Sequence, residues 1–175
     1  MAAKRHERTY ARKQAIQVLY QAEILESMPT SLLESDNSFI DGARPSEYAA
    51  RVINGVSDKC VAIDRMLGEY SENWAVDRMP AVDRAILRLA CYEMAYVDEV
   101  PVSVAINEAV DLAKEFGGED ESPRFVNGVL GRIADYLEEH GSLPEEDDGE
   151  ALEAAALAEA EPAGEAAEAS ELGEE

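Results

Sequence analysis

One stretch of this sequence, residues 80–96, decides the fold class; it reads PAVDRAILRLACYEMAY. Its apolar residues recur every three or four positions, which is the spacing of one helical face. Arg84 and Arg88 lie on another face of the same helix, and Pro101 follows its end. The stretch therefore predicts an amphipathic α-helix. The residues of its apolar face are Val82, Ala85, Ile86, Leu89, Ala90 and Tyr96.

Helical spacing recurs on both sides of this stretch. Apolar residues repeat at three- and four-residue intervals along 8–26, 45–71, 103–116 and 122–141. Residues 30–44 hold only short apolar pairs, which predict a short helix or an ordered loop. The sequence shows no hairpin signal and no alternating run long enough for a buried strand. It therefore predicts an all-α fold built from helix bundles.

Single residues add detail to this pattern. Gly55 interrupts the 45–71 segment and is expected to bend or split it. Trp74 lies in a connector and is expected to be a large core anchor. Cys60 and Cys91 lie far apart in apolar stretches without a C-x-x-C motif. Both are therefore expected to be reduced, buried thiols.

Charge is distributed unevenly along the chain. The 175 residues carry 15 Lys and Arg against 38 Asp and Glu, a net charge of −23. Residues 142–175 hold 13 acidic side chains and no basic one, and this Ala/Glu-rich composition predicts a disordered tail. Residues 1–17 instead carry five basic residues against Glu7. We expect a folded domain over 1–141, with a tail that either solubilises the protein or screens the basic arm.

The sequence offers little for catalysis or for membrane insertion. It lacks the common phosphate-loop, dinucleotide, zinc-protease and nucleophile-elbow motifs. Its two histidines, His6 and His140, stand in no metal-ligand or triad spacing. No apolar run approaches the ~20 residues of a membrane span, and the N-terminus lacks a secretory signal. We therefore expect a cytoplasmic binding protein, not an enzyme, with no cofactor and no metal.

The first positive signal is the basic arm at the N-terminus. Arg8 and Arg12 are four residues apart and share a helix face, and Lys4 and Arg5 extend the charge. Each guanidinium can donate two charge-assisted hydrogen bonds to one phosphate. Tyr10 lies among these charges and either stacks on an unpaired base or packs inward. The arm predicts an RNA-binding surface, with an ordinary basic N-terminus as the alternative.

The second signal is the segment 117–125, which reads GGEDESPRF. Its polar loop leads into a Ser-Pro pair that suits a helix start, where free backbone N–H groups favour a phosphate. Arg124 adds a full charge, whereas Asp120 and Glu121 oppose a phosphate but can accept hydrogen bonds from base amino groups. Phe125 either stacks on a base or packs in the core. The segment predicts a second RNA contact.

Four stretches together resemble the NusB family of transcription antitermination factors. Their order and spacing fit over about residues 8–140. The resemblance implies an all-α fold of two small helical bundles packed across one another, about 8–72 and 78–141. The four stretches are 11–21 (ARKQAIQVLYQ), 82–93 (VDRAILRLACYE), 100–117 (from VPVSVAINEAV to KEFG) and 125–131 (FVNGVLG).

The resemblance also implies a function. Members of the family bind boxA-type single-stranded RNA in nascent ribosomal transcripts. They do so together with NusE, a small-subunit ribosomal protein, and the complex helps RNA polymerase to read through terminators. The role is not catalytic. The residues implied for RNA are Arg5, Arg8 and Arg12 in the arm, and Asp120 or Glu121 with Phe125 in the loop.

The resemblance places Asp83 on the surface that faces NusE. Within the last matching stretch, Gly128 and Gly131 lie three residues apart and are expected to let helices approach closely. Two other functions remain open. One is a detached RNA-binding front of a ribosomal RNA cytosine methyltransferase, and the other is a protein–protein adaptor for a basic ribosomal protein without RNA binding of its own.

Overall fold

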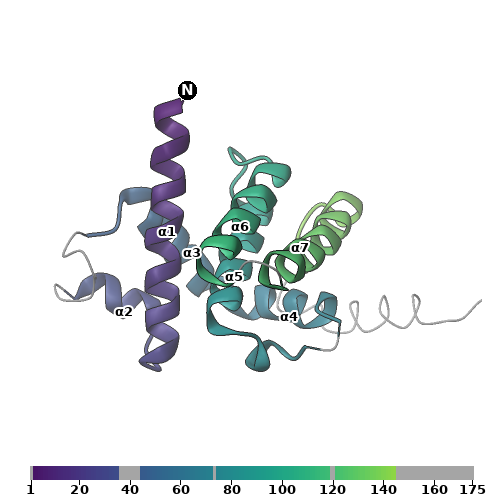
Figure 1. The fold of residues 1–175 in the computed structure, drawn as a ribbon, viewed down its shortest axis with the longest axis horizontal. Coiled ribbons are helices and arrows are strands. Elements are labelled where there is room, and N and C mark those ends of the chain that lie inside the picture. The colour runs from purple at the N-terminus through teal and green to yellow at the C-terminus, as the bar shows by residue number, and fades with distance from the viewer. Residues whose placement is uncertain (1, 36–43, 73, 119–120, 145–175) are drawn as a thin grey trace, which may run out of the picture.

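The computed structural model describes residues 2–35, 44–72, 74–118 and 121–144, with the side chains of residues 2–5 outside the description. Within these residues the chain forms seven α-helices, one short 3₁₀ helix and no strand (Figure 1). The all-α prediction is confirmed. The elements are α1 (Ala2–Ile24), α2 (Pro29–Glu34), α3 (Glu47–Asp58), α4 (Cys60–Tyr70), η1 (Val76–Arg78), α5 (Ala81–Tyr96), α6 (Val102–Phe116) and α7 (Glu121–His140).

Local sequence explains where several helices begin and end. Ser46 precedes α3, and its side chain accepts a hydrogen bond from the backbone N–H of Ala49. Pro80 and Pro101 stand directly before α5 and α6, at positions where a missing N–H costs nothing. At the end of α6, the N–H of Gly117 donates to the α6 carbonyl four residues earlier, at 2.9 Å. The predicted helical segments are therefore present.

Glycine positions differ from the expectation. The second predicted segment is split, but at Lys59 (φ −106°, ψ 14°) and not at Gly55, which lies inside α3. A Cβ at Gly55 would overlap the ring of Tyr92, so this glycine admits a side chain of α5. A Cβ on Gly128 or Gly131 would meet nothing within 4 Å. The expectation that these two glycines allow close helix approach is wrong.

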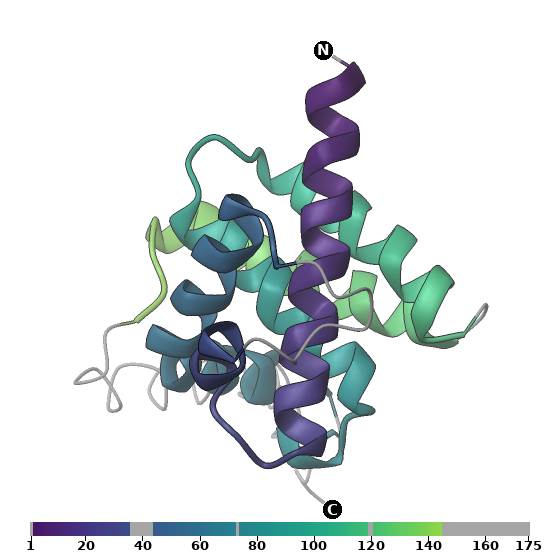
Figure 2. The ribbon, with the colours of Figure 1, turned by 90° about the vertical axis from the view of Figure 1, so that its left-hand side faces the viewer.

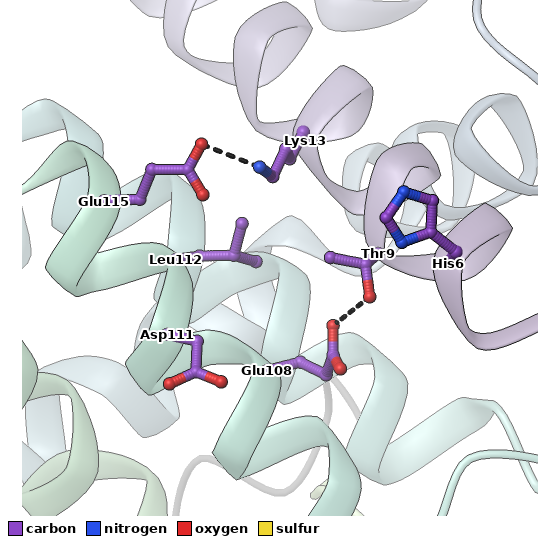
Figure 3. A pocket seen from close by; sticks show the side chains of 7 residues that line it. All are labelled: His6, Thr9, Lys13, Glu108, Asp111, Leu112 and Glu115. Atoms are coloured by element: carbon purple, nitrogen blue, oxygen red, sulfur yellow. Dashed lines mark hydrogen bonds and ion pairs between the residues drawn. The ribbon is translucent and has the colours of Figure 1, made fainter. Parts of the chain in front are cut away.

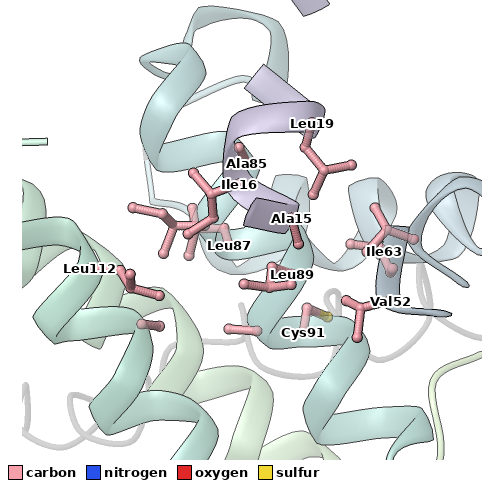
Figure 4. Close-up of a cluster of buried hydrophobic side chains, with 14 of the residues drawn as sticks. Ala15, Ile16, Leu19, Val52, Ile63, Ala85, Leu87, Leu89, Cys91 and Leu112 are labelled. Carbon is pink, nitrogen blue, oxygen red and sulfur yellow. The ribbon is translucent and has the colours of Figure 1, made fainter. Parts of the chain in front are cut away.

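Helix α5 forms the centre of the molecule and contacts α1, α3, α4, α6 and α7. Its buried Leu87 and Leu89 lie among side chains of the surrounding helices, such as Ile16, Val52 and Leu112 (Figure 4). This one core cluster includes residues from both expected bundles. The division into two bundles, about 8–72 and 78–141, stays a prediction.

Helix α1 projects beyond the rest of the described body at its N-terminal end (Figures 1 and 2). The described part of the chain ends at Pro144, where Leu143 is buried in the core cluster and Pro144 is buried as well. The folded body therefore extends past the expected limit at Gly141. The expected acidic tail lies outside the described residues from 145 onwards.

Two further observations concern the cysteines and the membrane. Cys91 is buried in the core, and this burial raises the pKa of its thiol to about 12. Cys60 is only half-buried, with Sγ 3.7 Å from a carboxylate oxygen of Asp64, so the expectation of a fully buried thiol is wrong for this residue. Among the described helices, none is both long enough and apolar enough to span a bilayer.

Candidate nucleic-acid interface

Arg8 lies at the surface, where α1 meets α3 and the loop before α6. Its guanidinium carbon is 3.9 Å from the centre of the Tyr48 ring, a cation–π contact. One of its nitrogens lies 3.7 Å from a carboxylate oxygen of Glu99, which also pairs with Arg51. About a third of the Arg8 side chain is exposed. This cation is therefore held loosely and remains accessible to a ligand.

Arg12 is buried one turn further along α1. Its Nε donates to both carboxylate oxygens of Glu93 at 2.9 Å, and Nη1 lies 3.3 Å from Glu108. The Tyr48 hydroxyl also donates to Glu93, and Thr9 donates to Glu108 at 2.7 Å. Arg12 and Glu93 are only 3% and 1% exposed. The network joins α1 to α3, α5 and α6.

The burial of Arg12 corrects the expectation that its side chain contacts RNA. Burial opposes its charge, but the attraction and hydrogen bonds of Glu93 outweigh that effect and raise the pKa of Arg12. Burial and the neighbouring Glu93 carboxylate raise the pKa of Tyr48. Tyr48 therefore stays protonated, and its hydroxyl donates a hydrogen bond to Glu93. Removing one partner of such a pair leaves a buried charge without compensation. Arg12 positions α1 and does not meet solvent.

A shallow pocket of about 260 Å³ lies between α1 and α6 (Figure 3). Lys13 lies at its wall and pairs with Glu115 at 2.7 Å, which places the middle of α1 beside the C-terminal end of α6. Three carboxylates and only one lysine line this pocket, so the charge of its lining does not favour an anionic ligand. The lining residues are His6, Thr9, Lys13, Glu108, Asp111, Leu112 and Glu115.

A second group of side chains gathers near the start of α7. Phe125 is half-buried against the core, and its ring centre lies 6.0 Å from that of Trp74, with the planes inclined at 51°. Trp74 is 47% exposed, so the expectation of a core anchor is wrong. Arg124 is exposed and has no ion-pair partner among the described residues. We call Trp74, Arg124 and Phe125 the α7 corner.

Asp83 lies beneath this corner and is only 4% exposed. It accepts a short hydrogen bond from Ser122 at the start of α7. Gly117 makes the contact possible, since a Cβ there would overlap Ser122 and lie 2.7 Å from Asp83 Oδ1. Burial raises the pKa of Asp83, although the Ser122 hydrogen bond opposes the shift. The expectation that Asp83 faces a partner is therefore wrong, because this carboxylate joins α5 to α7.

The remaining predicted residues lie at the start of α1 and at the start of α7, and only some of their side chains are described. Glu121 is exposed at the first position of α7. Lys4 and Arg5 lie in the first turns of α1, but their side chains are outside the described set, as is Asp120. Tyr10 is half exposed, so its ring is open to solvent and not packed inward. Among the predicted residues whose side chains are described, Arg12 and Asp83 are buried, whereas Arg8, Glu121, Arg124 and Phe125 are at least partly accessible.

Sequence reasoning missed the two buried carboxylates of the Arg12 network. Acidic residues on helices are usually solvated, and Glu93 and Glu108 look like such residues. A signal was present, because Glu93 lies four positions after Leu89 and Glu108 three after Ala105, both on buried stripes. A carboxylate on an apolar stripe indicates a buried partner of opposite charge. Among the described residues, no cluster of His, Cys, Asp and Glu could hold a metal ion.

The helical fold and its accessible cations and aromatic rings define a class of protein, an all-α candidate for nucleic-acid binding. Comparison with known proteins gives the family. The NusB family matches residues 9–135, and the chain belongs to this family. The matched region begins at Thr9 in α1 and ends at Asp135 in the last turns of α7, and thus includes the Arg12 network and the α7 corner.

Individual relatives agree with this assignment. The chain is 43% identical to the transcription antitermination protein NusB of Salinispora arenicola over 131 residues, which cover 74% of this chain and 96% of that protein. A structure of T. maritima NusB is 32% identical, with a TM-score of 0.64, and the match covers 79% of this chain and 94% of that one. The crystal structure of antitermination factors NusB and NusE in complex with dsRNA matches at 25% identity and a TM-score of 0.61, covering 75% and 98%.

Proposed function

We propose that this protein is a non-catalytic transcription antitermination factor. It binds boxA-type single-stranded RNA of nascent ribosomal transcripts together with NusE, in the cytoplasm, and supports processive transcription by RNA polymerase. The observation that carries the proposal is the family relationship over residues 9–135. A similar solved structure that contains NusB and NusE in complex with dsRNA supports NusE and RNA as classes of partner.

The accessible predicted residues supply the RNA contacts. Arg8 and Arg124 bind phosphates, and Phe125 offers its ring to a base. Lys4 and Arg5 extend the basic arm along the RNA, while Asp120 and Glu121 accept hydrogen bonds from base amino groups. Arg12 acts indirectly because it fixes the orientation of α1. The proposal assigns no contact to Asp83.

The ion pairs of the arm do not prevent RNA binding. Exposed ion pairs such as Arg8–Glu99 and Lys13–Glu115 contribute only about 0–1 kcal/mol each. A phosphate that accepts two hydrogen bonds from a guanidinium replaces such a partner at little cost. The buried Arg12–Glu93 pair is different, because leaving one of its buried charges without a partner costs about 3–5 kcal/mol. RNA therefore exchanges with the surface pairs and leaves the buried pair intact.

Fluorescence anisotropy of a labelled boxA-type RNA tests the proposal. We would titrate the protein with and without NusE at several salt concentrations. Each phosphate contact adds about 0.7 to the slope of log affinity against log salt for a single strand. Arg8→Ala is expected to weaken binding and reduce that slope by about this amount. Lys59→Ala, which removes an exposed cation outside the predicted site, is the control.

The outcomes separate the functions considered. Binding that needs or gains from NusE supports antitermination. Binding of NusE without any RNA affinity would instead establish the protein adaptor. Tighter RNA binding by a chain that ends at Pro144 would make the acidic segment 145–175 a competitor of RNA for the arm.

A further inference from the structure

The exposure of Trp74 calls for a functional explanation. An isolated exposed apolar residue is ordinary, but a large aromatic ring that contacts a second aromatic ring beside a free cation is not. Trp74 leaves 47% of its surface in water although it is the only tryptophan of the chain. It contacts Phe125, which stands next to Arg124. Aromatic rings and arginine are the groups on which unpaired bases stack.

The backbone around Trp74 is fixed. Its N–H donates to the carbonyl of Ser71 at 2.9 Å, and the buried Ser71 hydroxyl donates back to the Trp74 carbonyl at 2.6 Å. On the other side, Arg84 of α5 donates to the carbonyl of Val76. An aromatic ring on an anchored segment loses little conformational entropy when a ligand packs on it. The position of Trp74 is thus prepared before any ligand arrives.

The charges beside Trp74 also permit an anionic strand. Glu72 is the acidic residue that precedes it most closely in the chain, and Arg132 of α7 neutralises it at 2.9 Å. Arg78, in the short helix η1, is exposed together with its neighbour Asp77. Arg124 adds an exposed positive charge beside Phe125. Exposed Glu121, at the start of α7, opposes a phosphate here. The corner nevertheless offers the cation Arg124, which is unpaired among the described residues, whereas the only lysine of the pocket between α1 and α6 is paired with Glu115.

We infer that Trp74 extends the Phe125 stacking surface, so that the α7 corner receives two unpaired bases of single-stranded RNA. The ring centres are 6.0 Å apart and tilted, so the rings already touch and no base fits between them. Each ring instead offers its exposed face to one base, while Arg124 binds the phosphate backbone. The inference rests on the proposed function and names a contact beyond the predicted RNA residues.

The C-terminal end of α6 connects the two candidate RNA-binding regions along the chain. The Lys13–Glu115 pair holds α1 against the C-terminal end of α6. The next residue, Phe116, is 40% exposed, and the chain then passes through Gly117 into the α6–α7 connection. The C-terminal end of α6 thus contacts α1 and leads along the chain to the segment that holds Phe125.

The intrinsic fluorescence of the sole tryptophan reports this contact directly. We would titrate the full chain with NusE, first with boxA-type RNA and then with an abasic RNA of equal length, which has the same phosphates but no bases. The Trp74→Phe protein with NusE supplies the background signal. We expect the base-containing RNA to quench Trp74 emission and the abasic RNA to leave it nearly unchanged.

Affinity measurements give a second readout. Trp74→Ala is expected to weaken RNA binding by about fivefold or more, the lower end of base–aromatic stacking. The salt slope should stay constant, because no phosphate contact is lost. Trp74→Phe keeps a ring and should restore most of the affinity. Tyr20→Ala removes another exposed ring, on α1 and not part of the α7 corner, and serves as the matched control.

The outcomes distinguish base stacking on Trp74 from a protein contact at Trp74 and from failure of the proposed function. RNA binding with unchanged emission and an unaltered Trp74→Ala affinity would overturn this inference and leave the proposed function intact. Quenching by NusE alone, with no further change on adding RNA, would assign Trp74 to a protein contact instead. Absence of RNA binding under every condition would overturn the inference and the proposed function together.

Discussion

The α1 arm and the α7 corner both present arginine beside aromatic rings, but they use them in opposite ways. In α1, Arg12 is enclosed by Glu93 and Glu108, and its charge holds helices together. In the corner, Arg124 is exposed and the Trp74 ring is half in water. The difference teaches that an arginine is available to a ligand only where it is not paired with a buried carboxylate. The next four predictions test this contrast.

The largest effect is expected from Arg12→Ala. It leaves Glu93 and Glu108 buried without their cation, so the free energy of unfolding should fall by about 3–5 kcal/mol. Chemical denaturation measures this change. Arg51→Ala breaks an exposed pair with Glu99 and should cost under about 1 kcal/mol. Similar losses in the two variants would contradict the contrast between buried and exposed pairs.

Gly117→Ala tests the junction beneath the corner. The added Cβ would overlap Ser122 and crowd Asp83, so we expect a loss of about 1–3 kcal/mol in the free energy of unfolding. The matched control is Gly131→Ala, where open space surrounds the new Cβ within α7. Helix propensity then predicts a gain of about 0.5–1 kcal/mol. Thermal or urea unfolding measures both changes. If the free energy of unfolding changed with the same sign in both variants, this account would be refuted.

Arg124→Ala tests the availability of the corner cation. It should leave folding stability nearly unchanged because the side chain is exposed. RNA affinity should fall, and the salt slope should decrease by about 0.7, the value of one phosphate contact on a single strand. Anisotropy titrations at several salt concentrations measure both quantities. An unchanged slope would remove Arg124 from the RNA path.

The smallest effect concerns pH. Burial raises the pKa of Asp83 in the folded state, so folding favours its protonated form. This contribution to stability is fully present below the ordinary Asp pKa and is lost as pH rises through the raised value. Asp83→Asn cannot ionise. Its stability relative to the unaltered protein should therefore increase across that window, and a constant difference would contradict the raised pKa.

The helices could be predicted because their apolar period is local. The partners of Arg12 could not, since Glu93 lies 81 residues away and only packing brings the two together. Trp74 was misplaced for a related reason: a connector has no period from which exposure can be inferred. The sequence places Phe125 and Arg124 in one segment but does not pair them with Trp74. Local chemistry was predictable, whereas pairing between distant segments was not.

The buried Arg12 network has a consequence for the geometry of the arm. An α-helix turns by 100° per residue, so fixing one side chain between two carboxylates fixes the angular phase of the whole rod. Helix α1 runs without a break from Arg12 back to Ala2, a length of about 15 Å, and its N-terminal end projects from the body (Figure 2). The buried salt bridge thus fixes the rotation of α1 about its own axis, and with it the directions in which the side chains of the arm point.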